Sequence, residues 1–343
     1  MSGTSLDGVD LAFCSFSRKS NEWKYEILAA ETVKYPESWA RKLSDLENST
    51  ALDFAETDFD YGYYLGELCK TFLRAQHLEP DFIASHGHTI FHNPAKKITY
   101  QIGKGACIAA IAEYPVISDF RSLDVALGGQ GAPLVPVGDM LLFKDFDYCL
   151  NLGGFGNVSF DEGARRIAFD VCPVNIVLNH YARLNGKEYD INGEMARTGN
   201  IHPELLASLN ELAYYHTSAP KSLGKEWVLA EFMPVTGKYD IPVADQLRTV
   251  CEHIAIQVGK IIKPGTGKKM LITGGGAFNE FLVERIRQHV DVSVIIPDPM
   301  ILNYKEALIF AFLGVLRWTG EPNCLKSVTG ASKDNTGGSI FSS

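Results

Sequence analysis

The chain has 343 residues, of which 46% are hydrophobic and 21% are charged, and its formal net charge is −9 with a pI near 5.5. This length is too great for one ordinary hydrophobic core and predicts two domains. The acidic balance excludes a broad electrostatic surface for nucleic acid or anionic membrane, so any phosphate site must be local and small molecules are the expected partners.

The first half of the chain alternates strands with helices. Apolar positions recur at short period over 9–16 and 25–33, which predicts an antiparallel pair of strands. Helical spacing predicts helices at 51–76 and 106–113. Short buried strands are expected within 80–87, 97–103 and 114–120. This alternation is typical of an α/β protein.

The segment 126–136 is rich in glycine and proline, and we place the boundary between two domains, 1–127 and 128–306, beside it. Within the second domain we expect strands in 147–154, 157–160, 165–170 and 268–273, and helices near 173–183 and 277–290. The apolar stretch 307–316 is about half the length that spans a bilayer and is expected to be a buried helix.

The cysteine pattern indicates a reducing compartment. The seven cysteines are odd in number and never spaced as C-x-x-C, which argues against a disulfide framework and a zinc site. No leader of the secretory type stands before the first loop. We therefore expect a cytoplasmic protein.

Both halves contain a glycine-rich polar turn between two strands, SGTSLDGVDLAFCSF in the first and LNLGGFGNVSF in the second. This pattern suggests a duplicated α/β unit with a ligand cleft between the copies. A third glycine turn lies at 274–276. Each turn could be only a tight turn, or its N–H groups could bind nucleotide phosphates. None of them is a Walker A loop or a G-x-G-x-x-G fingerprint.

Asp170 stands at the end of a predicted strand, just before a predicted helix. It could cap that helix, or it could be a catalytic carboxylate that takes a proton from a hydroxyl or a water. Asp119, Arg121 and Asp124 follow another strand and could form a surface ion pair or a mixed fork for a polar substrate.

Three histidines, His86, His88 and His92, lie close together in SHGHTIFH. A strand would place His86 and His88 on one face, but no cysteine or acidic ligand stands near them. Polar contacts to a sugar or to a loop are therefore favoured over zinc.

The ordered set GTSLDGVD, SHGHTIFH, SDFRSLDVALGGQGAPL, NLGGFGN, FDVCPVN, PKSLGKE, TGGGAFN and KEALIFAFL resembles the anhydro-N-acetylmuramic acid kinases. The resemblance runs from the first residue to GGSIF near the end. It implies a two-domain actin-like, ribonuclease H-like duplicated ATPase fold with an interdomain cleft, in which 307–343 complete the first domain. The polar, glycine-rich end of the chain, which alone would read as a flexible tail, then belongs to the folded body.

The resemblance also implies an activity. Using ATP and Mg²⁺, such a kinase opens the 1,6-anhydro ring of the cell-wall sugar with water and phosphorylates O6, giving N-acetylmuramic acid 6-phosphate. The expected partners are this small molecule and ATP, with no nucleic acid and no membrane, and the expected assembly is a homodimer.

The site residues that the resemblance implies fall into three groups. Asp170 is the expected base that activates water. The nucleotide and its phosphates are expected at Gly3, Thr4, Ser5, Asp7, Gly8, Asp10, Gly153, Gly154, Asn157, Gly274, Gly275 and Gly276. The sugar is expected at His88, His92, Asp119, Arg121, Asn175 and Glu306.

The chain departs from the family pattern in several places. His88 stands where glutamine is usual, and FDVCPVN replaces FDTGPGN, which leaves open a kinase for another anhydro or amino sugar. Members also carry a strand ahead of the first loop that would pair with 9–16, so either the recorded start is late or this sheet has one strand fewer. A nucleotide-binding regulator without activity is the third alternative.

Overall fold

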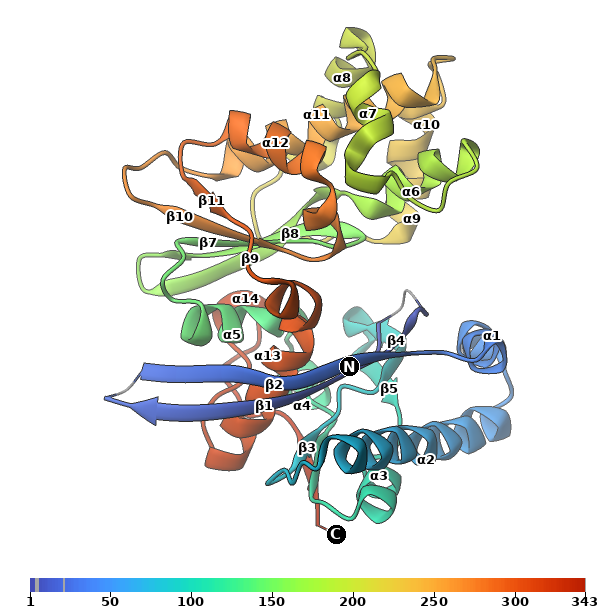
Figure 1. Ribbon diagram of the computed structural model, residues 1–343, viewed down its shortest axis with the longest axis vertical. Coiled ribbons are helices and arrows are strands. Elements are labelled where there is room, and N and C mark those ends of the chain that lie inside the picture. Colours follow the sequence, from blue (N-terminus) through green and yellow to red (C-terminus); the bar gives the residue numbers. More distant parts are fainter. Residues whose placement is uncertain (4–5, 21, 343) are drawn as a thin grey trace. The chain divides into compact units, whose positions relative to one another are not determined.

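The computed structural model describes residues 1–3, 6–20 and 22–342, and they form a mixed α/β protein of two compact units (Figure 1). Unit 1 comprises Met1–Leu142 and Tyr304–Ser343, and unit 2 comprises Phe143–Asn303. The division thus falls after residue 142, later than the predicted boundary after residue 127. The reason is α5 (Val135–Leu142), which packs against β2 (Glu22–Lys34) and whose Asp139 pairs with Lys305 at 2.7 Å, all within unit 1.

Unit 2 contains one five-stranded sheet in the order β11-β10-β7-β8-β9. The strand β7 pairs antiparallel with β8 and parallel with β10, so it joins a hairpin to a parallel pair. This arrangement fits the predicted ribonuclease H-like unit. The strands are β7 (Tyr148–Leu152), β8 (Phe155–Glu162), β9 (Arg165–Pro173), β10 (Lys269–Thr273) and β11 (Ser293–Ile295).

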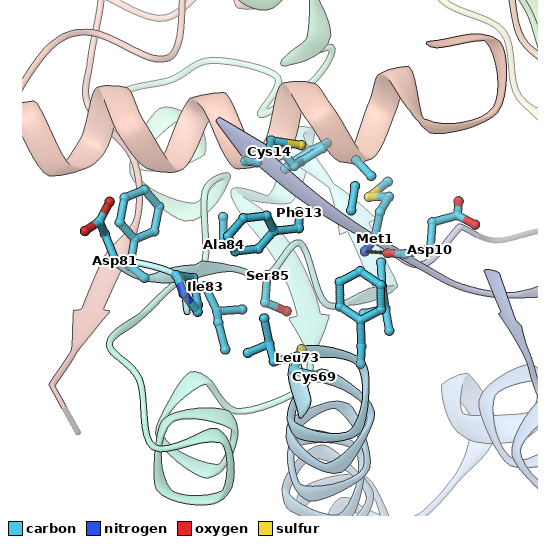
Figure 2. A pocket seen from close by; sticks show the side chains of 18 of the residues that line it. Met1, Asp10, Phe13, Cys14, Cys69, Leu73, Asp81, Ile83, Ala84 and Ser85 are labelled. Atoms are coloured by element: carbon cyan, nitrogen blue, oxygen red, sulfur yellow. Dashed lines mark hydrogen bonds between the residues drawn. The ribbon is translucent and has the colours of Figure 1, made fainter. Parts of the chain in front are cut away.

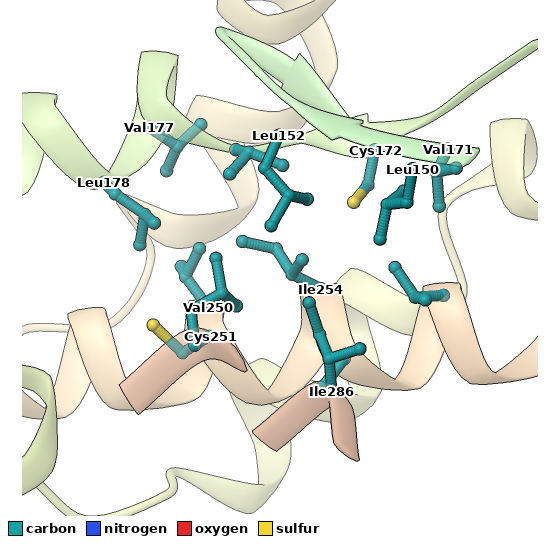
Figure 3. Close-up of a cluster of buried hydrophobic side chains, with 14 of the residues drawn as sticks. Leu150, Leu152, Val171, Cys172, Val177, Leu178, Val250, Cys251, Ile254 and Ile286 are labelled. Carbon is teal, nitrogen blue, oxygen red and sulfur yellow. The ribbon is translucent and has the colours of Figure 1, made fainter. Parts of the chain in front are cut away.

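Helices gather on one side of this sheet (Figure 1). They are α6 (Asn175–Leu184), α7 (Glu194–Thr198), α8 (Pro203–Asn210), α9 (Lys225–Trp227), α10 (Met233–Thr236), α11 (Val243–Ile261) and α12 (Glu280–His289). The core lies between them and the sheet, where Leu150 and Leu152 meet Val250 and Ile254 of α11 (Figure 3). All four side chains are fully or almost fully buried, so this layer fixes the strand ends that carry the glycine turns.

Unit 1 also combines strands with helices, but its strands do not form one continuous sheet. The hairpin of β1 (Gly8–Lys19) and β2 is one sheet, and β3 (Ile83–Ala84) and β6 (Val116–Ser118) form another with β12 (Ser339–Phe341). The predicted pair 9–16 and 25–33 is confirmed by β1 and β2. The chain end is folded as the family resemblance implied, because β12 pairs antiparallel with β6.

The helices of unit 1 follow the sequence pattern closely. The predicted helix 51–76 is α2 (Ala51–Gln76), and 106–113 is α3 (Gly105–Ala112). The strand β4 (His88–Asn93) was not predicted; it pairs antiparallel with β5 (Ile98–Ile102). The remaining α-helices are α1 (Glu37–Asp45), α4 (Ser122–Ala126), α14 (Lys326–Thr329) and α13 (Pro299–Thr319), whose first turn belongs to unit 2.

Helix α13 confirms the buried helix predicted at 307–316, since Leu308, Ile309, Phe312 and Leu313 are fully buried. Among the residues that the structure describes, it is the one helix with the length and apolar composition to cross a membrane, and 56% of its most apolar window is buried. A core helix passes the same test, so this property is weak support for a membrane span.

A cavity of about 620 Å³ in unit 1 lies between the sheet of β1 and β2 and the sheet of β3, β6 and β12 (Figure 2). It is lined by β1 from Val9 to Phe16, by Phe82–Ser85 around β3, and by side chains of α2 and α13. The main chain of Met1 makes two hydrogen bonds with Asp10 of β1, of 2.7 and 2.8 Å, at one end of this cavity. In unit 2, by contrast, β7 pairs with both β8 and β10, so the strands form one continuous sheet.

We predict that an apolar five-residue segment joined ahead of Met1 raises the free energy of unfolding by about 2 kcal/mol, because it buries apolar side chains against β1 and β3. It also removes a buried amino group, whose pKa is lowered by desolvation. Thermal melts of this fusion and of one with a Gly/Ser segment of equal length check the prediction. Equal melting temperatures would contradict it.

Candidate functional site

The described residues of the first glycine turn lie in unit 1. Ser2 bridges Val9, and the Leu6 N–H donates to the Gly3 carbonyl at 3.3 Å. Asp7 is exposed, whereas Gly8 is buried at the start of β1. The expected phosphate-binding residues Thr4 and Ser5 lie outside the described residues.

Asp10 lies on β1 directly after this turn. Its carboxylate accepts a hydrogen bond from the Thr32 hydroxyl of β2 at 2.6 Å. It lies within electrostatic range of Glu306 on α13 and of the Met1 amino group. Glu306 also lies within range of Arg121, so three of the predicted residues from distant parts of the sequence gather in unit 1.

Arg121 is held by its neighbours on two sides. Its Nη1 donates to the Gly131 carbonyl at 2.6 Å, and its Nε and Nη2 lie 3.1 and 2.9 Å from Nε2 of His86. His86 is buried, and its pKa is lowered well below the usual value by desolvation and by the Arg121 charge. The imidazole is therefore neutral and accepts from the guanidinium, which fixes the direction of Arg121.

The other residues expected near the sugar have different surroundings. His88 is buried, with Nδ1 at 2.8 Å from the Ser2 hydroxyl, and burial lowers its pKa to about 4. Through this contact His88 binds the first loop at Ser2, which is one of the two roles that the sequence left open for these histidines. His92 is exposed, and its Nδ1 lies 3.1 Å from the Thr99 hydroxyl oxygen. Asp119 is exposed, with a φ of +60°.

Asp124 does not take part in a surface ion pair, so that interpretation is wrong. It is fully buried, and its carboxylate accepts hydrogen bonds of 2.8 Å each from the Gly131 N–H, the Thr329 hydroxyl and the Asn335 amide. Thr329 and Asn335 come from the end of the chain. Asp124 therefore anchors that end to the turn that follows α4.

The second and third glycine turns lie together in unit 2. The carbonyls of Gly153 and Gly154 accept hydrogen bonds from the N–H groups of Asn175 and Ile176, at the start of α6, and of Val174 just before it. The Asn175 amide donates to the Leu152 carbonyl at 3.2 Å and lies 3.6 Å from a Cβ built on Gly275. Asn175 thus links the turn after β7 to the turn after β10.

The glycines of these turns differ in the space around them. A Cβ on Gly276 would approach Leu152 Cβ to 2.7 Å, and Gly274 has a φ of +83°, so close packing and backbone conformation explain these two. A Cβ on Gly154 would have no heavy atom within 4 Å. Gly154 is exposed and leaves open space into which a ligand phosphate can approach the backbone.

Asp170 lies on β9 opposite Asn157 of β8, so two predicted residues are cross-strand neighbours. The helix-capping alternative is wrong, because α6 begins at Asn175 and has no side-chain cap. Burial raises the pKa of Asp170, while a hydrogen bond of 2.8 Å from the Leu223 N–H to Oδ2 lowers it. The segment that supplies Leu223 was not singled out among the site residues.

No cluster of three or more metal-ligating side chains occurs within residues 1–3, 6–20 and 22–342. Mg²⁺ in nucleotide sites usually keeps several waters and binds one or two carboxylates together with the phosphates. The carboxylate of Asp10, beside the first turn, provides a donor of this kind.

We predict that Gly154→Val raises the KM for ATP at least about tenfold, because the added side chain fills the open space over the turn. Its Cβ meets no protein atom within 4 Å, so the melting temperature is expected to stay unchanged. Initial rates at varied ATP concentration, with a thermal melt of each variant, check both points. An unchanged KM would contradict the expected contact between Gly154 and the nucleotide.

Comparison with known proteins agrees with the resemblance seen in the sequence. The chain is 32% identical to the anhydro-N-acetylmuramic acid kinase of Hydrogenovibrio crunogenus over 99% of this chain and 96% of that protein. It is 33% identical to that of Mannheimia succiniciproducens, over 99% and 97%. A ROK family glucokinase from Streptomyces griseus, in complex with glucose and AMPPNP, aligns over 88% of this chain and 97% of its own with 12% identity. The TM-score of this alignment is 0.38.

The family model described as anhydro-N-acetylmuramic acid kinase matches residues 1–343, the whole of the chain. Together with relatives above 30% identity over nearly their full length, this match shows that the chain belongs to the anhydro-N-acetylmuramic acid kinase family.

Proposed function

We propose that this protein is an ATP-dependent kinase that opens 1,6-anhydro-N-acetylmuramic acid with water and phosphorylates O6, giving N-acetylmuramic acid 6-phosphate and ADP. Family membership supports this reaction. The observation that carries it is the half-buried Asp170, whose carboxylate is held at Oδ2 by the Leu223 N–H in the same unit as two glycine turns.

In this reaction Asp170 acts as the general base. A water oxygen attacks the anomeric carbon, the bond from that carbon to O6 breaks, and the water proton passes to the Asp170 carboxylate. O6 takes the γ-phosphoryl group as the bond to the β-phosphate of ATP breaks and ADP leaves. The raised pKa of Asp170 makes it a better proton acceptor than an exposed carboxylate.

The nucleotide is proposed to bind at the turns of unit 2. The open space over Gly154 admits a phosphate, and Asn175 at the start of α6 joins the two turns. Mg²⁺ would be held by the phosphates together with waters, and it would neutralise charge on the phosphoryl group. Phosphoryl transfer needs mainly positioning and charge neutralisation, so no lysine clamp is required.

The sugar is proposed to meet residues of unit 1. The direction of Arg121 is fixed by His86 and Gly131, and Glu306 lies within its electrostatic range. His92 and Asp119 are exposed and able to contact a ligand. The homodimer and the cytoplasmic location rest on the resemblance and the cysteine pattern and stay predictions.

The test uses 1,6-anhydro-N-acetylmuramic acid, ATP and Mg²⁺ in water enriched in ¹⁸O. We expect ADP release with one ¹⁸O atom at the anomeric carbon of the product and phosphate on O6. Turnover only with another anhydro or amino sugar would replace the substrate in this proposal. Nucleotide binding without turnover on any of these sugars would overturn it in favour of a regulator.

A further inference from the structure

The segment 214–223 lies along β9, an edge strand of the sheet in unit 2, at the position of Asp170. The Asp170 N–H donates to the Lys221 carbonyl at 3.3 Å, and the Tyr214 hydroxyl donates to the Asp170 carbonyl at 2.6 Å. Both backbone polar groups of Asp170 are thus bound by one segment that lies more than forty residues further along the chain. Such contacts restrict where the side chain can point.

The same segment binds the carboxylate itself. The Leu223 N–H donates to Oδ2 of Asp170 at 2.8 Å. Among the described residues, none donates a hydrogen bond to Oδ1. The two oxygens of this carboxylate therefore differ, because one is used by the protein and the other is available to a ligand.

The titratable groups near Asp170 are Cys172 on β9, with Tyr214 and Lys221 on the segment. Burial raises the pKa of Cys172 and of Tyr214, so both are neutral at physiological pH. The Lys221 ammonium lies 4.4 Å from the centre of the Tyr214 ring and donates to the Tyr214 carbonyl at 3.1 Å. The Lys221 ammonium therefore joins two parts of the 214–223 segment and is not paired with the Asp170 carboxylate.

We propose that the 214–223 segment positions the general base, with the Leu223 N–H holding Oδ2 so that Oδ1 is the atom that accepts the proton from water. The inference rests on the proposed role of Asp170. Leu223 and Tyr214 act through Asp170 and are positioning residues. The Leu223 N–H also offsets part of the effect of burial, since a donor to the ionised form favours that form.

The decisive experiment replaces the amide N–H of residue 223 by an ester oxygen, through incorporation of the α-hydroxy analogue of leucine. Leu223→Ala, which keeps the N–H, is the matched control. We expect the ester to move the acidic limb of the kcat/KM profile to higher pH by about one unit, with the KM for ATP unchanged. The control should keep the profile of the parent protein.

The pKa of Asp170 is measured separately by ¹³C NMR of its labelled carboxyl group in the free protein. We expect it to rise in the ester variant and to stay in place in Leu223→Ala. An ester variant with the parent pKa would overturn the inference, whatever its activity. A different outcome is that the pKa of Asp170 rises in the ester variant while Asp170→Asn keeps full activity. The hydrogen bond from the Leu223 N–H to Asp170 would then be supported, but the proposed role of Asp170 as the general base would be wrong.

Tyr214→Phe tests the anchoring of the strand. Loss of the hydroxyl is expected to lower kcat about tenfold with little effect on the KM for ATP, because the phenyl ring keeps its place while the hydrogen bond to the Asp170 carbonyl is lost. Parent kcat in this variant would remove Tyr214 from the positioning segment.

Discussion

Asp170→Asn is expected to lower ADP release with 1,6-anhydro-N-acetylmuramic acid by about 10²- to 10⁴-fold, the range that a positioned general base contributes. The amide keeps the size of the carboxylate and can still accept from the Leu223 N–H, so nucleotide binding should be retained. Single-turnover rates with saturating ATP, and a direct ATP-binding titration, measure the two properties. A variant within about threefold of the parent rate would exclude Asp170 as the base.

The same substitution has a predictable effect on stability. Because burial raises the pKa of Asp170, the folded state binds this proton more tightly than the unfolded state, and the ionised carboxylate lowers stability at neutral pH. Asp170→Asn should therefore be at least as stable as the parent at pH 7. Any gain should shrink as the pH falls through the raised pKa of the folded state toward about 4, and it should be lost below that pH, where the parent carboxyl group is protonated in both states. Denaturant titrations at pH 7 and near pH 4 compare the two proteins.

Asp124→Ala is expected to lower the free energy of unfolding by about 3–5 kcal/mol, the largest stability loss that we predict. The substitution leaves three buried donors, from Gly131, Thr329 and Asn335, without their shared acceptor. It also releases the end of the chain from α4. Urea unfolding of the variant, with limited proteolysis near residue 329, measures both consequences.

Asp60→Ala is the matched control for Asp124→Ala. Asp60 is exposed and pairs with Lys42 at 2.9 Å, so its loss should cost less than about 1 kcal/mol. Similar losses in the two variants would show that the three hydrogen bonds of Asp124 contribute no more than a surface ion pair.

The sequence predicts regular elements best where one periodic pattern runs for several turns or residues. The bounds of α2 are those of the prediction, because its helical spacing continues from Ala51 to Gln76. The strand β4 was missed because its run HTIFHN has two histidines and an asparagine and no clear alternation. Its partner β5, which the pattern did predict, completes the hairpin.

The candidate site depends on contacts between residues far apart in the chain, which local sequence patterns do not predict. Gly153, Gly154, Asn175 and the 274–276 turn lie together in unit 2, and the nucleotide and sugar contacts expected of them stay predictions. The partners of Asp170 and Asp124 were not predictable, because Leu223 and Thr329 lie far along the chain and contribute a backbone N–H and a hydroxyl. Neither group has a sequence signature, since every residue but proline carries an N–H and threonine is common. The motif PKSLGKE, which contains Leu223, was the available signal.

Most of the seven cysteines are buried, and this burial makes them probes of local opening. Cys107, Cys149, Cys172, Cys251 and Cys324 are buried, and burial raises the pKa of Cys324, for example, to about 12. Thiols of this kind react slowly with alkylating reagents as long as the fold is closed, because the thiolate is the reacting species. Cys324 belongs to unit 1 and Cys172 to unit 2. The alkylation rate of each, followed by mass spectrometry of its peptide, would therefore report how often each unit opens under native conditions.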